Sequence, residues 1–230
     1  LKTKIIVCDR NNIKKKYPKY IFKLTCFLYR FADAICVQTQ EMKSFYPKYL
    51  QKKMVVLENP LDFNEMEAQC IGQNVDKENT VISVGRLESQ KDFVTLIKAY
   101  QRVVVAHPDW SLKIYGQGNR KNELQNLIKQ GGLIGHVHLC GVTQAPFLEM
   151  KRAKIFVLSS FYEGFPNVLC EAMHAGLPCI STNCECGPTE LIENGKNGFL
   201  VEIGAVDAMA EKIRVLIENE KLREILGKEA

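Results

Sequence analysis

Short, nearly continuous apolar runs alternate with amphipathic stretches along most of this chain. The segments "TVISVG" and "WSLKIYG" have the length of buried strands, and "DFVTLIKAYQRVVVAH" lies between them. That longer segment carries apolar residues at helical spacing: Phe93, Leu96, Ile97, Tyr100 and Val104. Strands that are apolar on both sides and alternate with helices form a parallel sheet covered on both faces. The pattern therefore predicts an α/β fold.

The same alternation divides the chain into two parts. In the first part we expect strands at 4–9, 34–39 and 53–60 and helices at 18–32 and 41–46. In the second part we expect strands and helices in turn: strand 80–85, helix 92–107, strand 110–116, helix 119–132, strand 137–141, helix 145–153, strand 154–160, a helix from 167, strand 178–182, helix 188–194, strand 198–202 and a helix from 205.

The domain organisation follows from where the alternation breaks. Asn59-Pro60 ends a strand, and the polar, irregular residues 60–79 are typical of an interdomain linker. Residues 80–230 would then form one Rossmann-like domain. Residues 1–59 would be the C-terminal part of a second, truncated Rossmann-like domain, because so few strands cannot bury a full core. Since residue 1 is Leu, we expect this sequence to be part of a longer protein.

Positive charge is concentrated near the start of the chain. Residues 1–60 hold 13 Lys and Arg against 4 Asp and Glu, whereas the remainder holds 18 against 22. Residues 10–30 combine these cations with aromatic side chains. This composition fits a solvated face, slightly favoured on the residues alone, or contact with an anionic lipid surface or a pyrophosphate-bearing acceptor. We find no signal peptide, and the apolar runs are too interrupted for a membrane span.

Cysteine and histidine offer one alternative, a metal site. The nine cysteines are odd in number and scattered, which is typical of a reducing compartment. Cys184 and Cys186 form a C-x-C pair, but zinc sites usually show C-x-x-C or C…H spacing, so a metal is disfavoured. His136 and His138 have no third ligand nearby and are expected in a loop or at a strand edge. Several cysteines are expected to pack as small apolar residues: Cys26, Cys36, Cys140, Cys170 and Cys179.

Three loops that follow predicted strands carry the candidate chemistry. In a parallel sheet such loops open on the same edge, where ligands usually bind. The first loop, "SVGRLESQKD", contains Gly85, which lets a ligand approach the backbone. Its cations Arg86 and Lys91 suit a diphosphate, because arginine can bind two oxygens and lysine adds a point charge. Ordinary surface charges are the alternative.

The second loop, "YGQGN", contains Gly116 and Gly118. A glycine-rich loop before a helix could admit phosphate or ribose near backbone N–H groups. It lacks the third glycine of the dinucleotide-binding fingerprint, which disfavours a dinucleotide oxidoreductase. Taken alone, a plain turn at a helix start is the better interpretation.

The third loop lies in "SSFYEGFPNVLCEAMHAG" and carries two glutamates. Glu163 is in the loop, and Glu171 is expected to be half-buried at the border of the apolar stripe of the next helix. The N–H groups of Asn167 and Val168 are expected to be free and to face the same space. A carboxylate can accept hydrogen bonds from two neighbouring ribose hydroxyls. A glycosidase-like carboxylate pair, or a helix-dipole role for Glu171, are the alternatives.

These loops carry a resemblance to a known family. "GRLESQKDFVTLIKAY", "FYEGFPNVLCEAM" and "GPTELIENGKNGFLV" resemble, in this order, the C-terminal half of the GT4-type retaining glycosyltransferases, which have the GT-B fold. Glu163 and Glu171 match the E-x7-E motif of that family. "YRFADAICVQTQEMKSFY" and "VVLENPLD" resemble the end of its first domain and its linker, so the resemblance covers roughly residues 2–220. It implies a GT-B type α/β fold with doubly wound, Rossmann-like parallel sheets.

The resemblance also implies a role for each matching residue. Arg86 and Lys91 would hold the diphosphate of a nucleotide-sugar donor, and Glu163 would lie near hydroxyls of the transferred sugar; these three are the implied catalytic residues. Glu171 would bind the ribose. The segments 139–142 and 164–168 would contact the base and the sugar with its distal phosphate. The implied donor-binding residues are Gly85, Arg86, Lys91, Gly116, Gly118, Cys140, Val142, Glu163, Gly164, Phe165, Pro166, Asn167, Val168 and Glu171.

The function implied is transfer, with retention, of a hexose or N-acetylhexosamine from a UDP-sugar. "ECGPTELI" resembles transferases that build bacterial surface or lipid-linked glycans, which implies a glycan or lipid-linked acceptor. No metal, cofactor or nucleic acid is expected. The expected location is cytoplasmic, with peripheral contact of residues 10–30 at the inner face of the membrane. The alternative is a non-catalytic nucleotide-sugar-binding module on the same fold, because the resemblance implies that this sequence lacks the start of the first domain, where the family has a glycine-rich loop and most acceptor contacts.

Overall fold

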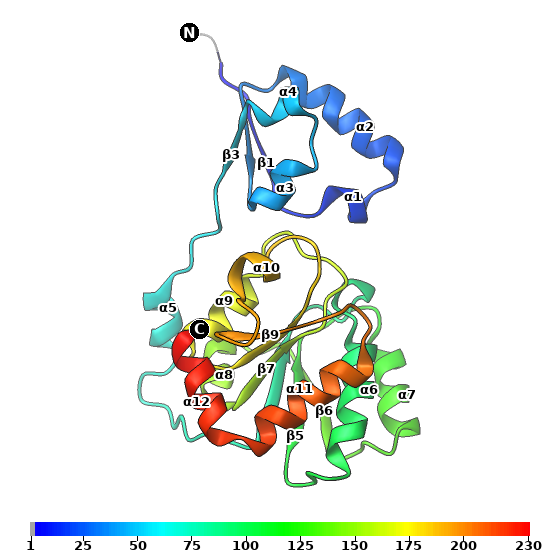
Figure 1. Ribbon diagram of the computed structural model, residues 1–230, viewed down its shortest axis with the longest axis vertical. Coiled ribbons are helices and arrows are strands. Elements are labelled where there is room, and N and C mark those ends of the chain that lie inside the picture. Colours follow the sequence, from blue (N-terminus) through cyan, green and yellow to red (C-terminus); the bar gives the residue numbers. More distant parts are fainter. Residues whose placement is uncertain (1–2) are drawn as a thin grey trace.

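The computed structural model describes residues 3–230, except for the side chain of Lys16. The chain forms two lobes that are stacked along the long axis of the molecule and joined by an extended segment (Figure 1). Each lobe is built around a parallel β-sheet. The α/β fold predicted from the sequence is therefore confirmed. The domain limits 1–59, 60–79 and 80–230 stay predictions, and residues 1 and 2 lie outside the described part.

The first lobe contains a three-stranded sheet with the strand order β1-β2-β3. Its strands are β1 (Ile6–Asp9), β2 (Ala34–Val37) and β3 (Met54–Val56). Its helices are α1 (Ile13–Lys16), α2 (Lys19–Leu28), the 3-10 helix η1 (Tyr29–Phe31), α3 (Gln40–Ser44) and α4 (Lys48–Gln51). The helices cover one face of the sheet, where β2 buries Ile35 and Val37 (Figure 1).

The segment expected to be an irregular linker contains a helix, α5 (Phe63–Ala68). Two local features explain it. Asp62 caps the helix, because its Oδ1 accepts a hydrogen bond from the Glu65 amide at 3.0 Å. Met66 on the opposite side is buried against the core of the second lobe. Met66 is a single buried apolar residue in a polar segment, so the composition did not indicate a helix. The expectation of irregular structure over 60–79 was wrong at this point.

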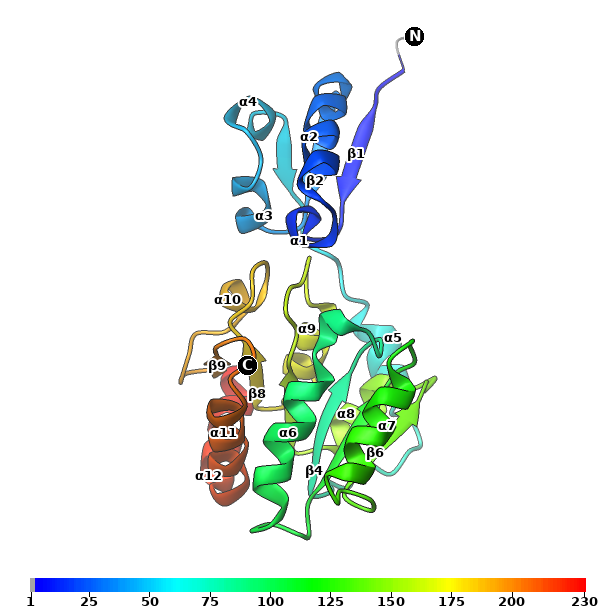
Figure 2. The same ribbon diagram turned by 90° about the vertical axis from the view of Figure 1, so that its right-hand side faces the viewer.

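The second lobe contains a six-stranded sheet with the strand order β6-β5-β4-β7-β8-β9. Its strands are β4 (Thr80–Val84), β5 (Ser111–Tyr115), β6 (Val137–Gly141), β7 (Ile155–Leu158), β8 (Cys179–Thr182) and β9 (Gly198–Val201). The direction of strand addition reverses between β4 and β7. Such a reversal opens a crevice at the carboxyl ends of the two strands, and that edge of the sheet faces the first lobe (Figure 2).

Helices cover both faces of this sheet, as the apolar strands require. The helices are the 3-10 helix η2 (Ser89–Lys91), α6 (Phe93–Val104), α7 (Lys121–Gln130), α8 (Pro146–Arg152), α9 (Asn167–His174), α10 (Pro188–Leu191), α11 (Val206–Glu218) and α12 (Glu220–Glu229). One core lies under α6, α7 and α11, and a second lies under α8 and α9 (Figures 1 and 2). All five apolar residues predicted for the α6 stripe are buried.

The end of the chain differs from the single helix expected from residue 205. The structure has two helices, α11 and α12, which meet at Asn219. Asn219 begins α12, because its side chain accepts a hydrogen bond from the Leu222 amide at 2.9 Å. Leu226 of α12 is buried in the core of the second lobe. Within residues 3–230, the structure has no helix with the length and apolar character needed to span a bilayer.

Candidate functional site

The candidate site is a cleft at the carboxyl ends of β4 and β7. It consists of two adjoining cavities of about 360 and about 350 Å3. Both are lined by Val84, the last residue of β4, and by Gly85 and Arg86, which follow it. Pro146 at the start of α8 also lines both. The first cavity extends toward the loop before α9 and the first lobe, and the second extends toward the end of β5. We call them the first and the second cavity.

Backbone hydrogen bonds hold the strand-end loops against one another. Gly85 N donates to Tyr115 O at 2.9 Å, and Gly116 N donates to Gly141 O at 2.7 Å. A Cβ atom on Gly116 would lie 1.9 Å from the Gly85 carbonyl oxygen, so only glycine permits this approach. The loops therefore form one rigid rim. The Gly116 N–H is bonded within the sheet and does not point at a ligand, which agrees with the interpretation of this loop as a plain turn.

The two predicted cations lie on the same rim in different surroundings. The Arg86 side chain is 62% exposed, and its guanidinium forms an ion pair with Glu88 at 3.0 Å. Lys91 is largely buried, and its Nζ lies 2.7 Å from Glu163 Oε1. Both line the first cavity. Arg86 therefore offers a charge that solvent screens, whereas Lys91 is fixed by a buried carboxylate.

Glu163 is nearly inaccessible, with only 5% of its surface exposed. Besides Lys91, its Oε1 accepts a hydrogen bond from Ser160 Oγ at 2.6 Å. Two donors on one oxygen compensate for the burial of the negative charge and fix the orientation of the carboxylate. The buried ion pair was not predicted, because Lys91 and Glu163 are 72 positions apart.

Glu171 lies one turn into α9, half-buried as predicted, and lines the first cavity. Burial raises the pKa of its carboxyl group, and no partner within residues 3–230 offsets that effect. A carboxylate in this position is short of hydrogen-bond donors. It suits a ligand that brings hydroxyl groups.

The start of α9 corrects one detail of the sequence prediction. The Asn167 amide is not free, because it donates to Phe165 O at 3.0 Å. The Val168 amide has no hydrogen-bond partner among the described residues, as predicted. The loop residues predicted to bind donor also line the first cavity: Gly164, Phe165, Pro166, Asn167 and Val168.

Two predicted donor-binding residues line neither cavity, Gly118 and Cys140. Gly118 instead packs on the first loop, where an added Cβ would lie 2.3 Å from the Leu87 carbonyl oxygen. Cys140 is exposed, contrary to the expectation that it packs as a small apolar residue, because β6 is an edge strand. Only Val142 of the segment 139–142 lines the second cavity. The roles predicted for Gly118 and Cys140 have no geometric support.

The metal alternative has no cluster to support it. Within the described part of the chain, no group of three or more His, Cys, Asp and Glu side chains is placed to hold a metal ion. Cys184 and Cys186 are free and buried, and burial raises the pKa of Cys184 to about 12. Cys186 packs into the apolar core of the first lobe. His138 lies on edge strand β6, as expected.

Sequence reasoning missed residues of the first lobe. Arg10 and Asn11 line the first cavity from the loop after β1. Their backbone packs on residues 164–166 before α9, which we call the donor-side loop because the sequence predicts donor contacts there: a Cβ atom on Gly164 would lie 2.5 Å from Arg10 O. The signal was available: Arg10 directly follows a predicted strand, as Arg86 does. The rule that loops after parallel strands meet at one edge, which we call the strand-end rule, therefore applies to the first part of the chain as well.

Known proteins are similar to this chain in sequence and in fold. The family model described as glycosyl transferases group 1 matches residues 67–230. An uncharacterized glycosyltransferase of Methanocaldococcus jannaschii is 35% identical over 205 residues, which are 83% of this chain and 50% of that protein. An N-acetylgalactosamine-N,N'-diacetylbacillosaminyl-diphospho-undecaprenol 4-alpha-N-acetylgalactosaminyltransferase of Campylobacter jejuni is 30% identical over 224 residues, 96% of this chain and 60% of that protein.

A solved structure gives the fold. HepE of Anabaena, in complex with UDP and glucose, superimposes with a TM-score of 0.86 at 20% identity, covering 98% of this chain and 65% of that chain. The GT-B fold implied by the sequence resemblance is thereby confirmed. The chain spans only 50% and 60% of the length of the two curated relatives. The roles of the individual site residues stay predictions.

Proposed function

Since this chain belongs to the group 1 glycosyltransferase family, we propose that the whole protein transfers a sugar from a nucleotide diphosphate sugar to a glycan or lipid-linked glycan. The donor we propose is a UDP-hexose or a UDP-N-acetylhexosamine, and the reaction proceeds with retention of configuration. HepE was solved with UDP and glucose, which supports this donor class. The Campylobacter jejuni relative is named for a diphospho-undecaprenol-linked acceptor, which supports a lipid-linked one here.

One observation carries the proposal. Four charged residues of the site lie on different elements. Arg86 and Lys91 follow β4, Glu163 follows β7 and Glu171 lies in α9. All four line a single cavity at the reversal of strand order. Two cations and two carboxylates in one crevice are complementary to the two kinds of group in a nucleotide-sugar donor, its diphosphate and its hydroxyl-bearing sugars. The diphosphate requires positive charge, and the sugar and ribose require hydrogen-bond acceptors.

The chemistry follows from charge movement. Cleavage of the sugar–phosphate bond places negative charge on the departing diphosphate. Fixed cations aimed at that position stabilise the transition state more than the ground state. Lys91 is suited to this role because Glu163 and the surrounding protein fix its ammonium group, which has three hydrogens and donates only one to Glu163 Oε1. Arg86 adds a second cation, which can bind two phosphate oxygens.

The carboxylates then divide the remaining tasks. Glu171 accepts hydrogen bonds from the ribose, and Glu163 lies beside the transferred sugar while it holds Lys91. No nucleophile is assigned on this chain, and we propose front-face attack, in which the departing phosphate helps to deprotonate the acceptor hydroxyl. A non-catalytic nucleotide-sugar-binding module is disfavoured, because the four polar side chains that the chemistry uses are all present at the cavity.

The test is calorimetry of the full-length protein with UDP, GDP and ADP. Arg86→Ala should weaken binding of the preferred nucleotide about tenfold, or about 1.4 kcal/mol. Arg86 is the better residue to change, since its side chain is 62% exposed and its loss does not unpair a buried charge. Arg102→Ala is the matched control, because Arg102 is a similarly exposed arginine that lines neither cavity.

Equal affinities for the unchanged protein and Arg86→Ala would show that the diphosphate assignment is wrong. Turnover of UDP-sugars then separates an enzyme from a binding module. In the proposed enzyme, Glu171→Ala lowers turnover while the protein stays folded. UDP binding without release of UDP from any UDP-sugar in the presence of acceptor lipid would favour the module.

A further inference from the structure

The charges that the second lobe places in the first cavity cancel. Its cations are Arg86 and Lys91, and its carboxylates are Glu163 and Glu171. Lys91 is directly neutralised by Glu163 at 2.7 Å. A diphosphate carries two or more negative charges and needs a surplus of positive charge. The charged side chains of the second lobe do not supply that surplus.

Arg10 of the first lobe supplies it. Among the described residues that line the first cavity, Arg10 is the one charged side chain from the first lobe. It directly follows β1, so the carboxyl end of the first sheet faces the carboxyl end of the second across the cleft. Including Arg10, the lining has three cations against two carboxylates. The net positive charge of the cavity therefore depends on the first lobe.

The position of Arg10 is fixed by contacts to the donor-side loop and helix. Its backbone carbonyl packs against Gly164, where an added Cβ would come within 2.5 Å. Its guanidinium donates to Asn59 Oδ1 at 3.0 Å, and Asn59 Nδ2 donates in turn to Asn167 Oδ1 at 2.8 Å. Asn167 begins α9, which also carries Glu171.

The guanidinium keeps donors for a ligand. Arginine has five N–H donors, and one bond to Asn59 leaves the others. Within residues 3–230, no carboxylate forms an ion pair with Arg10, whereas Arg86 and Lys91 each have one. A free planar cation at the edge of a polar cavity suits bidentate binding of phosphate oxygens.

We propose that Arg10 is a further binding residue for the diphosphate of the nucleotide donor, reaching it from the first lobe, with Asn59 as its positioning residue. This inference rests on the proposed function. It also assigns a physical link between the lobes: the donor diphosphate lies between Arg10 on one side and Arg86 and Lys91 on the other. Donor binding thus favours the arrangement in which the two lobes are together.

A diphosphate on a lipid-linked acceptor has the same chemistry and could reach Arg10 from the first lobe, because Arg10 also lines a cavity with Asp9, Ile13 and Tyr17. We assign the donor because the Arg10 carbonyl packs directly on the donor-side loop at Gly164. The test must therefore separate the two sources of diphosphate.

The experiment is calorimetry of the full-length protein with UDP and, separately, with uridine. Arg10→Gln should weaken UDP binding about tenfold and leave uridine binding unchanged, because only UDP carries the diphosphate. Arg10→Lys should restore part of the loss by returning the charge without the planar fork. Arg30→Gln is the matched control, since Arg30 is an exposed arginine of the same lobe that lines none of these cavities. Thermal unfolding verifies that each variant is folded.

Three results would overturn the inference. Equal UDP affinity for the unchanged protein and Arg10→Gln would show that Arg10 does not contact the donor. If Arg10→Gln also raises the KM for a lipid-diphosphate acceptor, Arg10 binds the acceptor instead. If the unchanged protein binds none of UDP, GDP and ADP, the proposed function fails as well. In the first two results the proposed function survives if Arg86→Ala weakens UDP binding.

Discussion

At the scale of residues, the Lys91–Glu163 ion pair shapes how the site can be tested. Side-chain exposure is 14% for Lys91 and 6% for Glu163, so each charge depends on the other for solvation. Removing one partner of such a pair costs about 3–5 kcal/mol, because the remaining charge is left buried and unpaired. A substitution of Lys91 therefore changes stability together with ligand binding. Arg86 and Arg10 are exposed, and changing either leaves no buried charge unpaired, so their variants report on binding more directly.

Glu171 gives a prediction for pH dependence. Burial raises the pKa of its carboxyl group in the folded protein, so folding opposes its ionisation. The folded state then holds the proton more tightly than the unfolded state, and this group lowers stability as the pH rises from the unfolded pKa through the folded pKa. We expect Glu171→Gln to stabilise the protein at pH 7.5 by less than about 1 kcal/mol, the size of most changes outside a core.

The gain from Glu171→Gln should disappear near pH 4, where the wild-type carboxyl is also protonated. Thermal unfolding of both proteins across this pH range measures it. Glu88→Gln is the control, because Glu88 is a partly exposed carboxylate on the same rim that is paired with Arg86. A difference that is constant across pH would show that ionisation of Glu171 has no part in the effect.

The strand-end rule predicted which residues meet at the site, but not their pairing. It brought Arg86, Lys91, Glu163 and Glu171 to one edge because parallel strands share a direction. It could not predict that Glu163 would be buried under Lys91 and Ser160, since that contact depends on how η2 packs against the loop after β7. Burial of a charge is set by tertiary packing, which periodicity does not encode.

At the scale of elements, backbone contacts between loops position the cations. Leu87 N donates to Gln117 O at 2.9 Å, and Arg120 N donates to Leu87 O at 3.0 Å. Gly118 lies between these two bonds. Apolar periodicity predicted the strands and helices that carry these loops, whereas α5 and the break at Asn219 depend on single capping residues and were missed.

The close loop contact predicts that Gly118→Ala is destabilising. The added Cβ would meet the Leu87 carbonyl oxygen at 2.3 Å and its carbonyl carbon at 2.6 Å, and backbone atoms cannot move aside without separating the loops. We expect a loss of about 1–3 kcal/mol, as for other overpacked sites. Urea unfolding measures it.

The matched control for Gly118→Ala is Gly131→Ala. Gly131 has an ordinary φ of −78° at the end of α7, and its nearest neighbours are 3.1 Å or more from the added Cβ. We expect a change within about 0.5 kcal/mol for it. If both variants unfold at the same urea concentration, the rim is not the rigid element described above.

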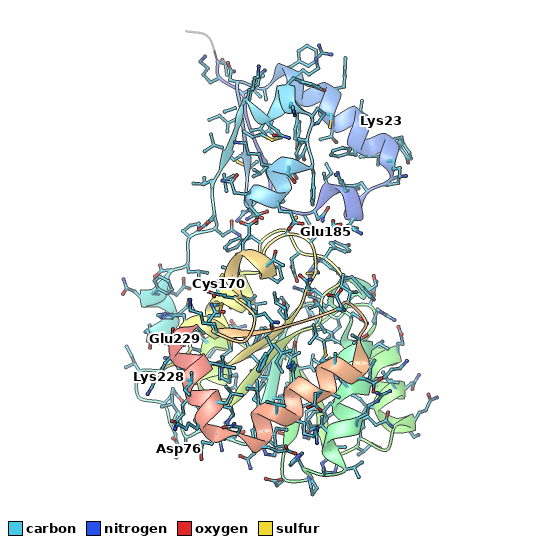
Figure 3. All side chains as sticks on the ribbon, in the orientation of Figure 1. Lys23, Asp76, Cys170, Glu185, Lys228 and Glu229 are labelled. Carbon is cyan, nitrogen blue, oxygen red and sulfur yellow. The ribbon has the colours of Figure 1, made fainter. Side chains whose placement is uncertain are left out.

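At the scale of the whole molecule, the lobes are held together by the loop between β8 and α10. Cys186 of this loop is buried in the core of the first lobe, and its amide donates to Glu41 Oε2 at 2.7 Å. Glu185, which lies at the junction in Figure 3, accepts a hydrogen bond from Asn12 at 3.0 Å. These contacts join residues more than 140 positions apart in sequence, so no local pattern predicts them. They fix the cleft in which Arg10 faces the second lobe.

The outer surface of the first lobe carries an apolar stripe on α2 and η1. Its members recur at helical spacing and are all at least half-exposed: Tyr20, Leu24, Phe27, Leu28 and Phe31. The cations Lys19, Lys23 and Arg30 border the stripe, and Figure 3 shows Lys23 on the outer side of α2. An apolar stripe flanked by cations matches an anionic bilayer surface, where each cation contributes about 1 kcal/mol.

We therefore predict that the full-length protein binds vesicles that contain phosphatidylglycerol and not vesicles of phosphatidylcholine alone. Charge reversal by Lys19→Glu with Lys23→Glu should lower the bound fraction severalfold, because repulsion replaces attraction, and added salt should do the same. Phe27→Ser should weaken binding through the apolar contact while the charge is unchanged. Lys121→Glu with Lys129→Glu on α7 of the second lobe is the control pair and should have little effect. Cosedimentation measures all of these, and equal binding by both charge-reversed pairs would assign any membrane contact to a different surface.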